Sequence, residues 1–154
     1  MRPQKAPPPP THPADYDRDV ILWAEEQARL LRAGRFAELD IEHIADEIED
    51  VGKAEKRELA SRMAVLLAHL LKWRFQPEKR TRSWRLTIRT QRERIELAIE
   101  DTPSLKSVLR SPKWQRDAWL DGRSQAERET GIEDLPEDCP FTMDEARDPE
   151  FWPE

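Results

Sequence analysis

The chain has 154 residues, which suits one domain with terminal extensions, and charged residues (38%) are as frequent as hydrophobic ones (37%). Its single cysteine excludes an internal disulfide and a zinc site built from several cysteines, and no apolar run approaches the roughly 20 residues of a membrane span. We therefore expect a protein of the reducing cytoplasm, with no cofactor and no membrane contact.

Residues 1–14, MRPQKAPPPPTHPA, are rich in proline, which lacks an amide donor and cannot continue a helix. We expect a disordered leader there. The first helix is predicted to begin near Asp15 or Asp17, because apolar residues recur from Tyr16 to Leu30 at helical spacing. It is predicted to end before Gly34, a residue type that favours the position after a helix.

A second helix is predicted to begin after Asp40, a favourable N-cap residue. Its apolar stripe consists of Ile41, Ile44, Ile48 and Val51, followed nearly in phase by Leu59, Met63, Leu66, Leu70 and Trp73. A glycine inside a helix costs about 1 kcal/mol relative to alanine, so we expect a break or a kink at Gly52. The helix is predicted to end near Phe75, because Pro77 follows.

Three further helices are expected. Ser83 is predicted to cap the third, and Thr or Ser before a proline predicts a short helix over 103–109 and another over 112–130, which Gly131 ends. Residues 132–154 form an acidic tail that retains Leu135, Phe141, Met143, Phe151 and Trp152. The sequence therefore predicts an all-α fold: an antiparallel helical bundle of four to five helices over residues 15–131, with the acidic C-terminal tail draped over it.

The formal net charge of −6 conceals segments of opposite sign. Residues 38–58 carry nine acids and three bases, and residues 127–154 carry eleven acids and two bases. Residues 72–94 carry nine bases and two acids, within the stretch HLLKWRFQPEKRTRSWRLTIRTQRER. Trp73 and Trp84 of this stretch fall on the apolar stripes of their helices, so we interpret them as core residues and not as platforms for stacking bases.

Several short motifs follow one another along the chain: DIEHIADEIEDVGKAEKREL, HLLKW, QP, SWRLTIRTQR, PSL, ETGI and CPF. In this order they resemble the bacterial family catalogued as domain of unknown function 29. The resemblance covers nearly the whole chain apart from the proline-rich leader. It implies a small all-helical bacterial protein, and it implies no activity.

On the third predicted helix, Arg82, Arg85, Arg89 and Arg92 recur every three or four residues and therefore share one face. Our first interpretation is that this row pairs with the acids of residues 46–50, because guanidinium groups bind carboxylates in a bidentate fork. An acidic protein partner and nucleic acid are the alternatives. The acidic net charge opposes nucleic acid, because it repels phosphate at long range.

The candidate binding site is a polar seam around the turn at Gln76 and Pro77. It comprises His69, Lys72, Arg74, Gln76, Arg82, Ser83, Arg85, Thr87, Arg89, Gln91 and Arg92, with Glu47 and Asp50 as facing acids. His69 lies at the edge of the apolar stripe. We expect it to be partly buried and to donate a hydrogen bond to a carboxylate of the acidic helix.

Asp40, His43 and Glu47 lie on one face of the second helix, in a pattern that di-iron bundles use for metal binding. Such a site repeats the pattern on another helix, and no carboxylate accompanies His69, so we predict no metal site. Cys139 precedes a proline among acids, which raise the pKa of a thiol and lower its reactivity. A metal-dependent bundle enzyme is therefore the weakest hypothesis.

These patterns predict no particular biochemical activity. They favour a small cytosolic helical module, protein-binding or regulatory, whose partner is another protein or a second copy of the chain. Nucleic-acid binding through residues 72–94 is the first alternative.

Overall fold

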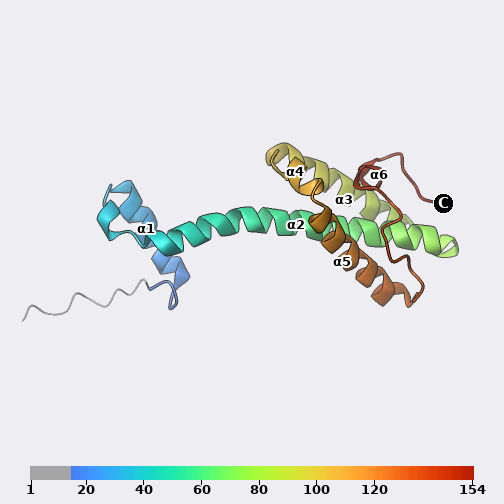
Figure 1. Cartoon of the computed structure of the whole chain (residues 1–154), viewed down its shortest axis with the longest axis horizontal. Helices are drawn as coiled ribbons and strands as arrows, with labels where there is room; N and C mark the ends of the chain where they lie inside the picture. Colours follow the sequence, from blue (N-terminus) through green and yellow to red (C-terminus); the bar gives the residue numbers. More distant parts are fainter. Residues whose placement is uncertain (1–14) are drawn as a thin grey trace, which may run out of the picture. The chain divides into compact units, whose positions relative to one another are not determined.

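The computed structural model describes residues 15–154, and the predicted disordered leader, residues 1–14, lies outside the described residues. Within residues 15–154 the chain is helical, without a strand (Figure 1). The α-helices are α1 (Val20–Arg32), α2 (Ile41–Phe75), α3 (Arg82–Asp101), α4 (Leu105–Leu109), α5 (Pro112–Thr130) and α6 (Met143–Arg147). Two short 3-10 helices, Phe36–Glu38 and Pro77–Lys79, precede α2 and α3. The predicted all-α class is confirmed.

The chain divides into two compact units after Gly52. The first unit contains α1 and the beginning of α2, and the second contains residues 53–154. Helix α2 is a single element that includes Gly52, so the helix does not break at that residue, and a kink there stays a prediction. No described helix combines the length and the apolar composition that crossing a membrane requires.

The first unit has a small core around Trp23 and Leu30, which are buried. Helix α1 begins at Val20, later than predicted, because the side chain of Asp19 accepts a hydrogen bond from the amide of Leu22 (3.1 Å) and caps the helix. Gly34 adopts a positive φ of 70° just after α1, as its predicted role requires. These two residues therefore set the limits of α1.

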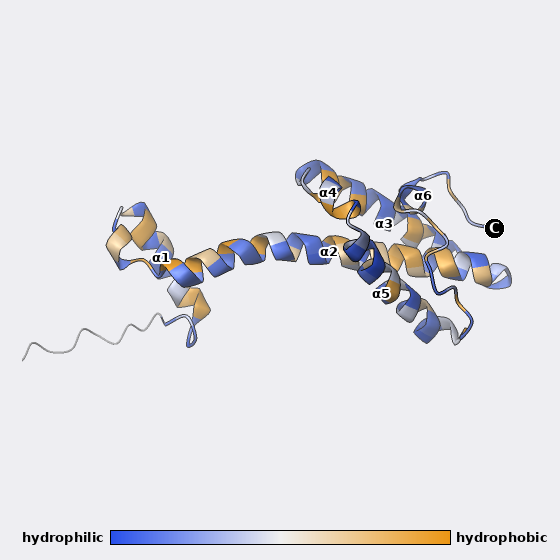
Figure 2. Cartoon of the chain, viewed as in Figure 1, coloured by the Kyte–Doolittle hydropathy of each residue, from blue (hydrophilic) through white to orange (hydrophobic). Residues whose placement is uncertain are grey.

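The second unit is built around the C-terminal half of α2, where hydrophobic residues are concentrated (Figure 2). Buried residues of this half-helix include Leu59, Met63, Leu66, Leu67, Leu70 and Leu71, and α3 supplies Ile88, Ile95 and Ile99. Gly122 of α5 allows a close approach to α2: a Cβ there would lie 2.8 Å from the carbonyl oxygen of Ala64. Trp73 is buried in this core and Trp84 packs against it, as predicted.

Two predicted helix starts in the second unit are wrong. Thr81, not Ser83, caps α3, because its hydroxyl accepts a hydrogen bond from the amide of Trp84 (3.1 Å). Thr102 ends α3 instead of starting α4. In contrast, Ser111 and Gly131 bound α5 as predicted.

The C-terminal segment after α5 contributes to the same core, with Leu135, Phe141 and Met143 buried. Trp119 of α5 donates a hydrogen bond from Nε1 to the carbonyl oxygen of Glu137 (2.8 Å). Helix α6 begins with a capping box between Thr142 and Glu145. Apolar burial and backbone hydrogen bonds thus hold this segment against α3 and α5.

Candidate functional site

Three arginines of the predicted row on α3, Arg85, Arg89 and Arg92, line a groove of about 600 Å³ within the second unit. The groove is lined by Trp73, Arg85, Arg89, Arg92, Glu93, Pro149, Glu150 and Trp152. Its residues come from the end of α2, from α3 and from the C-terminal segment, which lies beside α3 (Figure 1). We call it the arginine–tryptophan groove.

Arg92 connects α3 to the C-terminal segment. Its side chain is buried, and it donates hydrogen bonds from Nε to the carbonyl oxygen of Ala146 (2.8 Å) and from Nη2 to that of Phe151 (2.7 Å). A longer contact joins Nη1 to the carbonyl oxygen of Pro149 (3.5 Å). Burial lowers the pKa of Arg92, but a guanidinium remains protonated in proteins. The predicted pairing of Arg92 with acids of α2 is therefore wrong, because backbone carbonyls occupy its donors.

Two tryptophans form the apolar part of the groove. The ring centroids of Trp73 and Trp152 are 4.8 Å apart, with an interplanar angle of 53°. The guanidinium of Arg85 lies 5.5 Å from the ring centre of Trp73 and 5.9 Å from that of Trp152. Arg80 lies 4.9 Å from the ring centre of Trp73 and donates to its carbonyl oxygen (2.8 Å). Cation–π attraction therefore holds arginines against these rings.

Arg85 and Arg89 are the open cations of the groove. Both are exposed, and they lie one helical turn apart on α3. Within residues 15–154, neither has a carboxylate at ion-pair distance. Each guanidinium retains several N–H donors for a ligand, whereas those of Arg92 are engaged.

At the α2 end of the predicted polar seam, the polar side chains already bind other groups of the second unit. Lys72 is buried and pairs with Glu129, and its Nζ lies 3.3 Å from Nε2 of His69. His69 donates from Nδ1 to the carbonyl oxygen of Val65 (2.8 Å), not to a carboxylate of the acidic segment as predicted. Burial lowers the pKa of His69, and the hydrogen bond from Lys72 lowers that of Glu129. This cluster has a structural role within the second unit.

The remaining seam residues are scattered. Gln76 is buried, Arg74 lies 5.7 Å from the ring centre of Phe75, Thr87 is half-buried, and Arg82 and Ser83 are exposed. Gln91 is half-buried, and its Oε1 has no hydrogen-bond partner among the described residues. Glu47 and Asp50 belong to the first unit, where Glu47 accepts a hydrogen bond from the hydroxyl of Tyr16 (2.7 Å). Pairing of these two acids with the other arginines stays a prediction.

The three residues of the considered metal site are engaged in hydrogen bonds within the first unit. Asp40 accepts hydrogen bonds from Nε1 of Trp23 (3.0 Å) and from Nδ1 of His43 (2.7 Å). Burial raises the pKa of Asp40, but these hydrogen bonds outweigh it and hold the pKa below its usual range, while Asp40 raises the pKa of His43. The hydrogen bond to Glu47 raises the pKa of Tyr16 to about 12. Residues 15–154 contain no cluster of three or more potential metal ligands.

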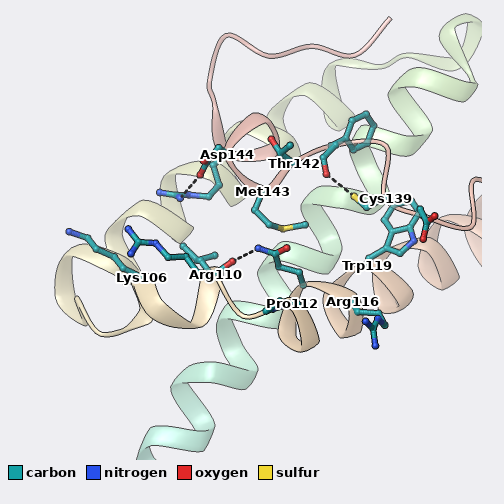
Figure 3. A pocket seen from close by; sticks show the side chains of 14 residues that line it. Lys106, Arg110, Pro112, Arg116, Trp119, Cys139, Thr142, Met143 and Asp144 are labelled. Carbon is teal, nitrogen blue, oxygen red and sulfur yellow. Dashed lines mark hydrogen bonds and ion pairs between the residues drawn. The ribbon is translucent and has the colours of Figure 1, made fainter.

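A second concave site, of about 740 Å³, was not predicted from the sequence (Figure 3). Lys106 of α4 and Arg110, which follows α4, lie on one side of it, Trp119 and Cys139 lie on the other, and Met143 lies between them. Burial raises the pKa of the Cys139 thiol, which donates to the carbonyl oxygen of Phe141 (3.1 Å). The mixture of basic and apolar side chains suits a ligand with an anionic group and an apolar body. No sequence signal marks this site, because its residues come from three separate segments.

Comparison with protein families matches residues 16–152 to a family described as Domain of unknown function DUF29. No curated protein and no solved structure matches the chain.

Proposed function

The chain belongs to the DUF29 family, a domain of unknown function for which no activity is assigned, and we propose from the geometry of its groove that it is a protein-interaction module. Its ligand is an acidic segment of a partner protein, bound in the arginine–tryptophan groove. We also propose the cytoplasm as its compartment, where the single thiol of Cys139 remains reduced.

The open donors of Arg85 and Arg89 carry this proposal. Two exposed guanidiniums one turn apart suit successive carboxylates, because each can form a bidentate, charge-assisted pair. The tryptophan beneath Arg85 restricts its guanidinium, so less side-chain entropy is lost when a carboxylate binds. Glu93 and Glu150 also line the groove. Their negative charges repel any carboxylate of the ligand that lies beside them.

Nucleic acid is the second candidate, because arginines and tryptophans also bind single strands. Two observations favour a protein ligand over it. Trp73 is buried and Trp152 is half-buried against it, and arginines lie over both rings, so a base would have to displace these contacts before it could stack. The net charge of −6, with eleven acids within residues 127–154, repels a phosphate backbone.

The test is a titration of the full chain against a fluorescent glutamate-rich peptide, read by anisotropy at low and physiological salt. We expect Arg85→Glu combined with Arg89→Glu to weaken binding at least about tenfold. The matched control is Arg94→Glu combined with Arg128→Glu, which changes the net charge equally at exposed arginines outside the groove. This control is expected to retain most of the affinity.

A single-stranded oligonucleotide of the same formal charge as the peptide distinguishes the two candidates. Weaker binding of the oligonucleotide than of the peptide supports a protein ligand. Tighter oligonucleotide binding that the groove variant abolishes would replace the protein ligand with nucleic acid. Equal losses in the groove variant and in its control would refute both, because binding would then depend only on net charge.

A further inference from the structure

Hydrophobic exposure in this chain is concentrated in the first unit. Among residues 15–154, the exposed large hydrophobic residues of this unit are Val20, Ile21, Leu22, Leu31, Phe36, Ile41, Ile48 and Val51. The second unit, though much larger, exposes only four: Phe75, Leu86, Leu97 and Leu120. Scattered exposed hydrophobics are normal on a monomer, but exposed hydrophobics that line one face of a helix form a candidate interaction surface.

The clearest part of this surface is a row on α2, which we call the α2 seam. It consists of Ile41, Ile44, Ile48 and Val51. Ile41, Ile48 and Val51 are 66%, 68% and 65% exposed, whereas the continuation of the same stripe after Gly52 is buried in the core of the second unit. The successive spacings of three, four and three residues are those of a helix that packs against another helix along one seam.

The glycine at position 52 is a second, independent indication that another helix packs against α2. It lies inside α2, where glycine is unfavourable by about 1 kcal/mol relative to alanine, and a Cβ at this position would lie more than 4 Å from the surrounding atoms of residues 15–154. Gly122 differs, because its missing Cβ admits the backbone of α2. Gly52 and Ala45 each follow a seam residue by one position and flank the seam with small side chains, so another helix can approach closely there.

Four of the acids on α2 lie away from the seam. At 3.6 residues per turn, Glu42, Asp46, Glu49 and Asp50 fall on the opposite side of α2. A third side is covered by Tyr16, which precedes α1, stacks on His43 (ring centroids 4.0 Å apart) and donates a hydrogen bond to Glu47. The seam is therefore apolar and uncharged, although the unit as a whole is acidic.

We propose that the α2 seam is the interface at which a second copy of this chain binds. A basic partner would find no carboxylate within the seam, whereas an identical copy presents the same apolar row and the same small flanking residues, and its acids point outward. Two copies bring two α1 helices and two α2 segments together, which is the composition of a four-helix bundle.

The test is the molar mass of the full chain, measured by light scattering and sedimentation from low to high micromolar concentration. We expect a dimer that high salt does not dissociate, because its contacts are apolar. Ile48→Glu combined with Val51→Glu is expected to give a monomer with unchanged helical circular dichroism. Leu86→Glu combined with Leu97→Glu, the same change at exposed residues of α3, is expected to remain dimeric.

Gly52→Trp keeps the test decisive if the first variant fails to fold. A Cβ at this position would lie more than 4 Å from the surrounding atoms of residues 15–154, so the added side chain need not disturb the fold of one copy. It is expected to weaken the dimer at least about tenfold. A monomeric wild type at every concentration, or a dimer that survives both seam variants, would overturn the proposal. Dissociation by high salt would overturn it too, because that response indicates association through acidic and basic surfaces.

Discussion

Replacing Arg92 with methionine tests whether this side chain holds the C-terminal segment against α3. Methionine preserves an unbranched apolar side chain but removes the two short hydrogen bonds to the carbonyl oxygens of Ala146 (2.8 Å) and Phe151 (2.7 Å). Hydrogen bonds from a charged donor contribute about 1.5–3 kcal/mol each, so their sum is roughly 3–6 kcal/mol. The freed carbonyls regain water when the segment detaches, so we expect a loss of about 2–4 kcal/mol in the free energy of unfolding.

Urea denaturation followed by tryptophan fluorescence measures this loss. Arg89→Met is the matched control: the same chemical change at an exposed position of α3 is expected to stay within about 0.5 kcal/mol of wild type. Arg92→Lys should recover less than half of the loss, because one ammonium cannot reproduce a fork of donors. Trypsin should also cleave after Arg147 faster in Arg92→Met. Equal unfolding midpoints for Arg92→Met and Arg89→Met would refute the anchoring role.

Three further predictions concern packing and charge. Gly122→Ala adds a methyl group 2.8 Å from a backbone oxygen of α2, and its overpacking cost of about 1–3 kcal/mol should exceed the gain in helix propensity and lower the thermal midpoint. Glu129→Ala leaves the buried ammonium of Lys72 without its carboxylate and should lower the free energy of unfolding in urea by roughly 1–3 kcal/mol. Lys72→Met leaves only an exposed carboxylate and should change this free energy little. A larger loss in Lys72→Met than in Glu129→Ala would contradict the assigned pair. In a proton NMR titration, the pKa of His43 should lie above 6.5 and the pKa of His69 below it. The contribution of His43 to stability is then lost as pH rises through its folded pKa, and that of His69 is lost as pH falls below 6.5. If both histidines titrate on the same side of 6.5, one of the two environments is wrong.

Helix content and most helix ends could be predicted from the sequence, because they depend on neighbouring residues. Gly34 and Gly131 supply the positive φ angles that follow α1 and α5, and Ser111 caps the helix that Pro112 begins. The cap at Ser83 was predicted wrongly for a local reason as well, since Thr81 competes for the same role two residues earlier.

The roles of the arginines depended on tertiary structure. Arg85, Arg89 and Arg92 are equivalent in the helical pattern, yet two of them are exposed and the third is buried. The difference arises because the C-terminal segment, more than 50 residues further along the chain, places its carbonyl oxygens beside Arg92 alone. A periodic pattern specifies which side chains share a face, but it does not specify what covers that face.

The apolar stripe of α2 shows the same difference between what the sequence pattern specifies and what the tertiary structure decides. Its period was evident in the sequence from Ile41 to Trp73, but only the part after Gly52 is buried by α3, α5 and the C-terminal segment. Likewise, Gly52 and Gly122 are both glycines within helices, and only the three-dimensional packing distinguishes the one that admits a neighbouring backbone. The sequence by itself therefore determined the helices and their apolar faces, because these depend on local propensity and spacing. Burial and partners were decided by the tertiary structure, because they depend on segments distant in the chain.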